Sequence, residues 1–114
     1  MSAAFRVREF APWTGLFAGA AAWFVHHQTA SDLIIWDCRL GGPFLTGGLG
    51  LICGLVTVVG GLISWGSRKP MVGASHELGL PGFAGVVGAG AAAMFLLAIL
   101  FQSLTGFIVG VCER

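Results

Sequence analysis

Residues 44–65 read FLTGGLGLICGLVTVVGGLISW, an apolar stretch that contains no charged residue. A helix needs about 20 mainly apolar residues to cross the hydrocarbon core of a bilayer, and this stretch is long enough. Two further segments, 11–36 and 82–111, are also long and mainly apolar. The sequence therefore predicts an all-α integral membrane protein, a single domain over residues 1–114 with three transmembrane helices at about 11–36, 44–65 and 82–111.

The composition of the chain agrees with a membrane protein. Apolar residues make up 56% of the 114 residues and charged residues only 10%, whereas soluble domains contain about 25% charged residues. The mean hydropathy is +0.89. The net charge is +1, and no basic cluster exceeds Arg68-Lys69, so nothing favours a nucleic-acid partner. Membrane lipid is the expected surrounding.

The distribution of Lys and Arg predicts an orientation, because these residues are more frequent on the cytoplasmic side of a membrane. The side of the N-terminus and of the loop 66–80 carries four such residues, and the other side carries two. They are Arg6, Arg8, Arg68 and Lys69 against Arg39 and Arg114. We expect a cytoplasmic N-terminus, an external C-terminus and a multi-pass location in a bacterial inner membrane.

An alternative for the first segment is a cleaved secretory signal peptide, since Arg6 and Arg8 precede an apolar run. Cleavage after Ala30 would place Gln28 at position −3, where a small residue is needed, and the apolar run resumes at Leu33. A spanning helix is therefore the preferred interpretation.

The first segment contains a polar run, HHQTASD, at residues 26–32. Ionisable groups inside a membrane are costly and are normally paired. Because residues three or four apart share a helix face, one polar stripe is predicted, formed by His27, Gln28, Ser31 and Asp32. His26 projects about 100° away from His27. We expect this cluster to form hydrogen bonds with a partner or a neighbouring helix, and Gln102 to do the same across helices.

Two alternative uses of the polar run stay open. Haem or copper could be ligated by His26 or His27, with Met94 on the third segment as a second ligand at similar depth. Adjacent histidines do not share a helix face, however, so no metal or cofactor is assigned firmly. A small proton- or solute-conducting subunit would use His27, Gln28 and Asp32, although no other acidic residue lies in a predicted span.

Small residues at four-residue spacing predict close helix packing, because they let two backbones approach. One glycine pair occurs in each predicted span: Gly15 and Gly19, Gly50 and Gly54, and Gly106 and Gly110.

The three cysteines suggest a disulfide rather than redox chemistry. Cys38 and Cys112 both fall at the predicted external ends of helices, where an oxidising compartment would permit a bridge. Cys53 lies in the middle of the second span and is expected to be a buried small apolar residue. A Cys-x-x-Cys motif is absent, which argues against thiol-redox catalysis and a zinc site.

Part of the first segment resembles small multi-span membrane proteins encoded beside bacterial haem-copper oxidase genes. The likeness covers roughly residues 11–38 and rests on Pro12-Trp13, Gly15, Gly19, Ala22-Trp23, the histidine-glutamine step and Cys38. The chain departs from this pattern in having two histidines and an acidic pair, Asp32 and Asp37. The resemblance implies a bacterial inner-membrane protein associated with a respiratory complex, and it transfers no catalytic residue.

These observations together predict a protein that acts by association. No phosphate-binding loop, nucleophile motif or Ser/His/Asp set at workable depth occurs in the sequence. We therefore expect no enzymatic activity. The predicted function is a non-catalytic accessory subunit or assembly factor of a larger membrane complex.

Overall fold

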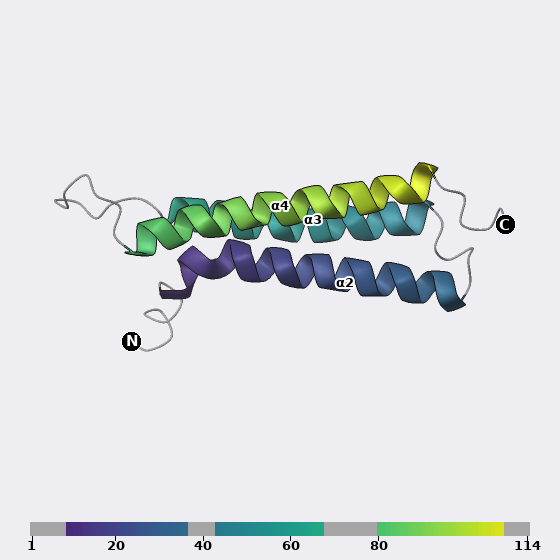
Figure 1. The fold of residues 1–114 in the computed structure, drawn as a ribbon, viewed down its shortest axis with the longest axis horizontal. Coiled ribbons are helices and arrows are strands. Elements are labelled where there is room, and N and C mark those ends of the chain that lie inside the picture. Colours follow the sequence, from purple (N-terminus) through teal and green to yellow (C-terminus); the bar gives the residue numbers. More distant parts are fainter. Residues whose placement is uncertain (1–8, 37–42, 68–79, 109–114) are drawn as a thin grey trace.

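The computed structural model describes residues 9–36, 43–67 and 80–108, and every regular element in these ranges is helical. The order is a short 3₁₀ helix, η1 (Ala11–Trp13), followed by α2 (Thr14–Trp36), α3 (Pro43–Gly66) and α4 (Leu80–Ile108). The three α-helices lie side by side along their length, with α2 and α4 running in the same direction and α3 opposite (Figure 1). The prediction of an all-helical chain with three long helices is confirmed.

The helix starts follow from local chemistry. Pro12 lies inside η1, where its missing N–H costs nothing, and the Thr14 N–H closes the 3₁₀ turn on the Ala11 carbonyl. The first segment therefore enters its α-helix at Thr14 rather than at residue 11, because the proline-containing turn is tighter. Pro43 is the first residue of α3, and this position suits a residue that has a fixed φ and no donor.

Two of the three helices are long and apolar enough to cross a membrane. They are Phe44–Gly66, with a mean hydropathy of 2.0, and Gly82–Ile108, with 2.3. Only 28% of the most apolar window of each is buried, so neither helix is enclosed by the described part of the bundle. α2 is also long, with 23 residues, but its polar run lowers its hydropathy, and it is not one of the two helices apolar enough to cross a membrane.

The interior of the bundle is narrow and built from small side chains. The buried apolar residues are Ala22, Cys53, Ala84, Ala92 and Ile99. Cys53 is a free thiol in this core, packed with Ala22 and Ile99. Small residues leave room for the helix backbones to approach closely, and the bundle buries polar side chains as well: His26, Thr46, Thr57 and Ser64.

Glycines make this close approach possible where helices touch. A Cβ on Gly88 would meet the Pro12 carbonyl and, at 2.7 Å, the Ser64 hydroxyl, and one on Gly60 would lie 2.6 Å from the Ala18 Cβ. Real Cβ atoms do not approach other atoms this closely. η1 and all three α-helices therefore converge at one end of the bundle only because these positions carry no side chain.

The six glycines singled out from the sequence occupy different surroundings. An added Cβ at Gly15 would meet the Gly88 carbonyl; at Gly19, the Phe95 ring at 2.9 Å; and at Gly50, the Ser103 hydroxyl. Those at Gly54 and Gly106 would make ordinary contacts, at 3.4 Å with Leu96 and 3.5 Å with Thr46. Gly110 lies outside the described residues.

Candidate functional site

His26 lies in the interior of the bundle, although the sequence pattern placed it outside the predicted polar stripe. Its side chain is fully buried, with 0% exposure. It projects from α2 between α3 and α4, where an added Cβ on Gly50 would lie 3.3 Å from its Nε2. A helical pattern groups residues by face but does not decide which face points inward. Here the space left by Gly50 admits the imidazole of His26.

Gln102 on α4 joins both histidines. The His26 Nδ1–H donates to Gln102 Oε1 at 3.2 Å, and Gln102 Nε2 donates to His27 Nδ1 at 2.9 Å. A neutral imidazole carries one proton on one of its two nitrogens. The single amide therefore requires opposite tautomers, with the proton of His26 on Nδ1 and that of His27 on Nε2.

Ser103 completes the buried end of this network. Its Oγ lies 3.4 Å from His26 Nε2, and its hydroxyl donates to the Ile99 carbonyl at 2.8 Å. Both ring nitrogens of His26 thus face polar groups of α4. With its proton on Nδ1, His26 has an acceptor at Nε2, and the single Ser103 proton can serve either that nitrogen or the Ile99 carbonyl. A buried polar side chain costs free energy unless it finds partners, so the hydrogen bond from Nδ1 to Gln102 is the one that offsets the burial of the imidazole and links α2 to α4.

His27 lies at the surface of the bundle. Its ring is exposed and stacks on Trp23, with ring centroids 5.4 Å apart and an interplanar angle of 10°. Trp23 in turn contacts the Phe95 ring at 6.1 Å. Because Gln102 occupies Nδ1, the Nε2–H of His27 is the donor that this site presents to its surroundings.

The other members of the predicted stripe do not join the buried network. Gln28 and Asp32 are exposed on α2, and Ser31 donates back to the His27 carbonyl at 2.8 Å. The hydrogen bonds among the described residues run from Ser103 through His26 and Gln102 to His27, and they do not continue to Asp32. Sequence reasoning did not identify Ser103. Its position directly after Gln102 in a long apolar segment was the available signal.

A small hollow opens beside this network. Its volume is about 170 Å³, enough for a few water molecules or one side chain of a partner. It is lined by His26, His27, Ala30, Ser31, Gln102 and Thr105. The hollow therefore places both histidines, Gln102 and the hydroxyls of Ser31 and Thr105 around a single opening on the bundle surface.

The arrangement does not pair the histidines with Met94. Gly19 packs against Phe95, and His26 meets Gln102 and Ser103, so Met94 lies about 12 Å along α4 from Gln102. Its side chain is 70% exposed. The described residues contain no group of three or more His, Cys, Asp or Glu suited to a metal ion. The match in depth expected for Met94 was wrong, because the register of α2 against α4 places its neighbour Phe95 against Gly19, about two helical turns before His26.

A second buried polar contact, which the sequence analysis did not identify, lies near the start of α2. Ser64 on α3 is fully buried; it accepts the Gly15 N–H at 2.6 Å and donates to the Pro12 carbonyl at 3.0 Å. In the 3₁₀ turn the Thr14 N–H donates to the Ala11 carbonyl. In an α-helix that carbonyl would accept the Gly15 N–H, which here donates to the Ser64 hydroxyl instead. Ser64 therefore caps α2 from a neighbouring helix.

The candidate disulfide between Cys38 and Cys112 falls outside the described residues. No protein-family model matches the chain, and comparisons with curated proteins and with solved structures give no match either.

Proposed function

We propose that this chain is a non-catalytic accessory subunit or assembly factor of a larger bacterial membrane complex, and that it acts by helix packing. The proposal includes three membrane spans with a cytoplasmic N-terminus and an external C-terminus. The contact surface is the polar face of α2, defined as His27, Gln28 and Asp32. The assignment to a respiratory complex rests on the resemblance of residues 11–38.

The observation that supports this function is the exposure of the polar face of α2. All three side chains are exposed on the surface of the bundle, and among the described residues only one of the three, His27, forms a hydrogen bond to another helix, at its Nδ1. His27 lies nine residues before the end of α2 at Trp36, which is about 14 Å at 1.5 Å per residue. In a spanning helix this depth is within the hydrocarbon, where polar and ionisable groups facing lipid are costly. A partner helix that supplies hydrogen bonds would remove this cost.

The buried polar groups support the same conclusion by contrast. His26 and Ser64 have partners within the chain, so the bundle satisfies its own interior. The polar face of α2 differs because its groups lie outside that interior. A bundle that has partners for its buried polar groups and also presents polar groups on one outer helix face is expected for a subunit that docks through one helix.

Site-directed photo-crosslinking in the native membrane tests this proposal. A benzoyl-phenylalanine at position 28 should give one discrete adduct to another protein, which mass spectrometry would identify. The matched control is position 52. Ile52 is also exposed, lies two residues from the Gly50–Ser103 contact, and projects from α3. Absence of an adduct at position 28, or the same adducts at both positions, would contradict the proposed surface.

A further inference from the structure

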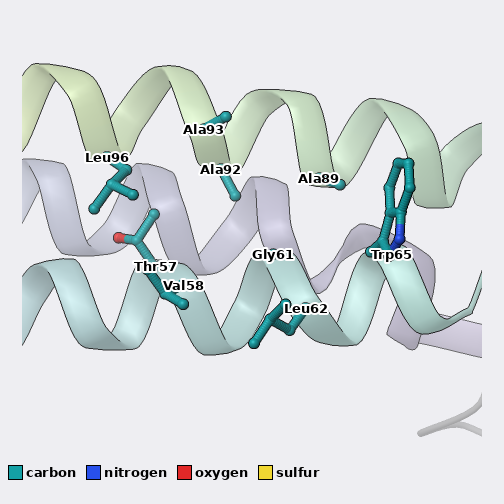
Figure 2. A pocket seen from close by; sticks show the side chains of 9 residues that line it. All are labelled: Thr57, Val58, Gly61, Leu62, Trp65, Ala89, Ala92, Ala93 and Leu96. Carbon is teal, nitrogen blue, oxygen red and sulfur yellow. The ribbon is translucent and has the colours of Figure 1, made fainter.

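The seam between α3 and α4 and the hollow beside the histidines differ in the chemistry of their linings. The seam, shown in Figure 2, has a volume of about 340 Å³ and one hydroxyl in its lining, that of Thr57. This hydroxyl donates to the Cys53 carbonyl at 2.8 Å, and no titratable side chain lines the seam. The smaller hollow is lined by His26, His27 and Gln102. Of the two, it is therefore the hollow in which a change of protonation alters hydrogen bonds.

The amide of Gln102 lies between the two imidazoles. Its Oε1 is 3.2 Å from His26 Nδ1, and its Nε2 is 2.9 Å from His27 Nδ1. Ser103 Oγ lies 3.4 Å from the other ring nitrogen of His26, Nε2. An amide has a donor end and an acceptor end, and a half-turn of the group exchanges them without moving either ring. The same atoms can therefore hold two different arrangements of protons.

The first arrangement, with Gln102 Oε1 facing His26, is that of the structure and leaves both rings uncharged. His26 donates through Nδ1, and His27 accepts at Nδ1. The one proton of the Ser103 hydroxyl goes to the Ile99 carbonyl at 2.8 Å. His26 Nε2 is then an acceptor that receives no proton from Ser103, because a hydroxyl has only one proton to donate.

The first arrangement does not accommodate a charged His27. An imidazolium carries a proton on both nitrogens, so the Nδ1–H of His27 would face the NH₂ group of Gln102. Turning the amide brings Oε1 to His27 and the NH₂ group to His26 Nδ1, which must then be free of its proton. The proton of His26 is then on Nε2, opposite Ser103. The Ser103 oxygen can accept it, because its own proton is donated to Ile99. Each contact in this second arrangement pairs one donor with one acceptor.

We propose that Ser103, His26, Gln102 and His27 form a two-state proton switch. Protonation of His27 turns the Gln102 amide and moves the proton of His26 from Nδ1 to Nε2. His27 gains one proton from water, whereas His26 releases one proton to water and takes up another, so the net uptake is one proton. The hollow of about 170 Å³ has room for the water that exchanges these protons. Histidine changes its charge between about pH 5 and 8, so pH operates the switch.

The surroundings of His27 stabilise a cation without supplying a competing charge. The ring of Trp23 stacks on it at 5.4 Å, and the face of an indole attracts a positive charge. In the described residues α4 has no titratable side chain, and α3 has only the buried Cys53. Asp32 on α2 is exposed and outside the network, and Glu9 precedes η1 at the far end of α2. The charge change therefore belongs to the histidines.

The switch goes beyond the proposed function, because all four of its residues belong to this chain and it operates without a partner. It also changes what the polar face of α2 presents, since His27 is neutral in one state and charged in the other. The two tests fail separately. An absent crosslink at position 28 leaves the proton positions unchanged, and a network that does not switch leaves the crosslink unchanged.

Nitrogen-15 NMR of the full chain in lipid bilayers, with labelled histidine, tests the switch. A ring nitrogen that carries a proton resonates apart from one that does not, so the position of each proton is observed directly. The background variant His76→Gln leaves two labelled histidines, because the chain contains three. His27→Asn in the same background then assigns the signals of His26.

At high pH we expect the proton of His26 on Nδ1 and that of His27 on Nε2. As the pH falls, His27 should take up a second proton. His26 should stay neutral while its proton moves to Nε2 with the same midpoint. The proposal would be overturned by a His26 that keeps its Nδ1 proton beside a charged His27. It would equally be overturned by a His26 that carries its proton on Nε2 at high pH.

Ser103→Ala removes the acceptor that the second arrangement needs. The midpoint for protonation of His27 should fall by several tenths of a pH unit, the effect of one interhelical hydrogen bond. The matched control is Thr105→Val. The Thr105 hydroxyl also lines the hollow, but it donates to the Phe101 carbonyl of its own helix at 2.9 Å, so its loss should leave the midpoint unchanged. Equal midpoints in both variants, each with the helical circular dichroism of the wild type, would contradict the role of Ser103 and with it the switch.

Gln102→Leu provides a second variant that separates coupling from folding. Without the amide, the proton position of His26 should no longer follow the charge of His27, although His27 still titrates. If His26 in a folded Gln102→Leu protein still changed its proton position with His27, the amide would not be the link between the two rings.

Discussion

Gln102 is the residue on which the polar network depends, because its one amide satisfies two imidazoles at once. The carbonyl oxygen faces the buried ring of His26 and the NH₂ group faces the exposed ring of His27. An amide is suited to this bridge because it carries one acceptor and one donor side by side. A carboxylate in its place would offer only acceptors and would change the tautomer of His27.

We predict that Gln102→Leu lowers the free energy of unfolding by about 1–3 kcal/mol. Interhelical hydrogen bonds in membrane proteins contribute about 1 kcal/mol or less, and a buried polar group that loses its partner adds about 1–3 kcal/mol. Reversible unfolding by a denaturing detergent, followed by circular dichroism, measures the change. Gln28→Leu is the control, since Gln28 is exposed and should leave the stability of the isolated chain nearly unchanged. Equal losses in both variants would show that the bridge contributes nothing specific.

The polar run was identifiable from the sequence, but the orientation of its residues was not. Helical spacing separates His26 from His27 and the rest of the run on any helix. Which of the two histidines enters the bundle depends on the rotation of α2, and that rotation is set by Gly50 and Ser103 on other helices. Contacts between residues 24 and 77 positions apart leave no periodic signal in a single sequence.

At the level of the elements, the bundle is held at one end by backbone contacts rather than by large side chains. Gly15, Gly60 and Gly88 lie where helices meet, and the Ser64 hydroxyl fills the small space that remains between them. Dispersion between closely packed backbones is the main attraction available to helices in lipid, which is as apolar as their own side chains. This contact also sets the register that brings His26 to Gln102 further along α2 and α4.

We predict that Gly88→Ala destabilises the bundle by about 1–3 kcal/mol, the usual cost of forcing extra atoms into a filled contact. The added methyl would meet the Pro12 carbonyl, a backbone atom that cannot rotate away. Gly90→Ala is the control on the same helix. It meets open space and should be neutral or stabilising by up to about 1 kcal/mol through helix propensity. The same detergent unfolding measurement applies, and a Gly88→Ala protein as stable as Gly90→Ala would contradict the role assigned to this contact.

The existence and approximate limits of the helices were predictable because they depend on local features. Apolar length and the prolines at 43 and 81 define α3 and α4 almost without reference to the rest of the chain. The sequence predicted that glycines would lie at helix contacts, but it did not identify which glycines. Gly60 and Gly88 belong to none of the four-residue pairs singled out, and their contacts depend on how the helices cross. Among 19 glycines, spacing alone does not identify those that face a neighbour.

Across the described residues, large apolar side chains lie outside and several polar side chains lie inside. Large apolar side chains such as Leu51, Leu62, Phe101 and Phe107 are exposed, whereas His26, Thr57 and Ser64 are fully buried. Soluble monomers rarely expose apolar patches beyond a few hundred Å². This distribution is compatible with a lipid surrounding, and α3 and α4 are long and apolar enough to cross a membrane. The number of spans then depends on α2, whose polar run lowers its hydropathy.

The sidedness of the two termini decides whether α2 crosses the membrane. With three spans the termini lie on opposite sides, and if only α3 and α4 cross they lie on the same side. We predict three spans, because α2 packs against both apolar helices and its His26 is satisfied only there. The bias of Arg6, Arg8, Arg68 and Lys69 places the N-terminus in the cytoplasm.

The measurement uses two proteins that each carry one reactive cysteine. The first has Ser2→Cys in a background without native cysteines. The second keeps the native Cys112, with Cys38→Ser and Cys53→Ala. A membrane-impermeant maleimide should label position 112 in right-side-out vesicles and position 2 only in inverted vesicles. Full labelling after detergent lysis shows that both thiols are reactive. Labelling of both positions from the same side would mean that α2 does not cross. The polar face of α2 would then meet water or headgroups at little cost, and no partner helix within the membrane would be needed to offset that cost.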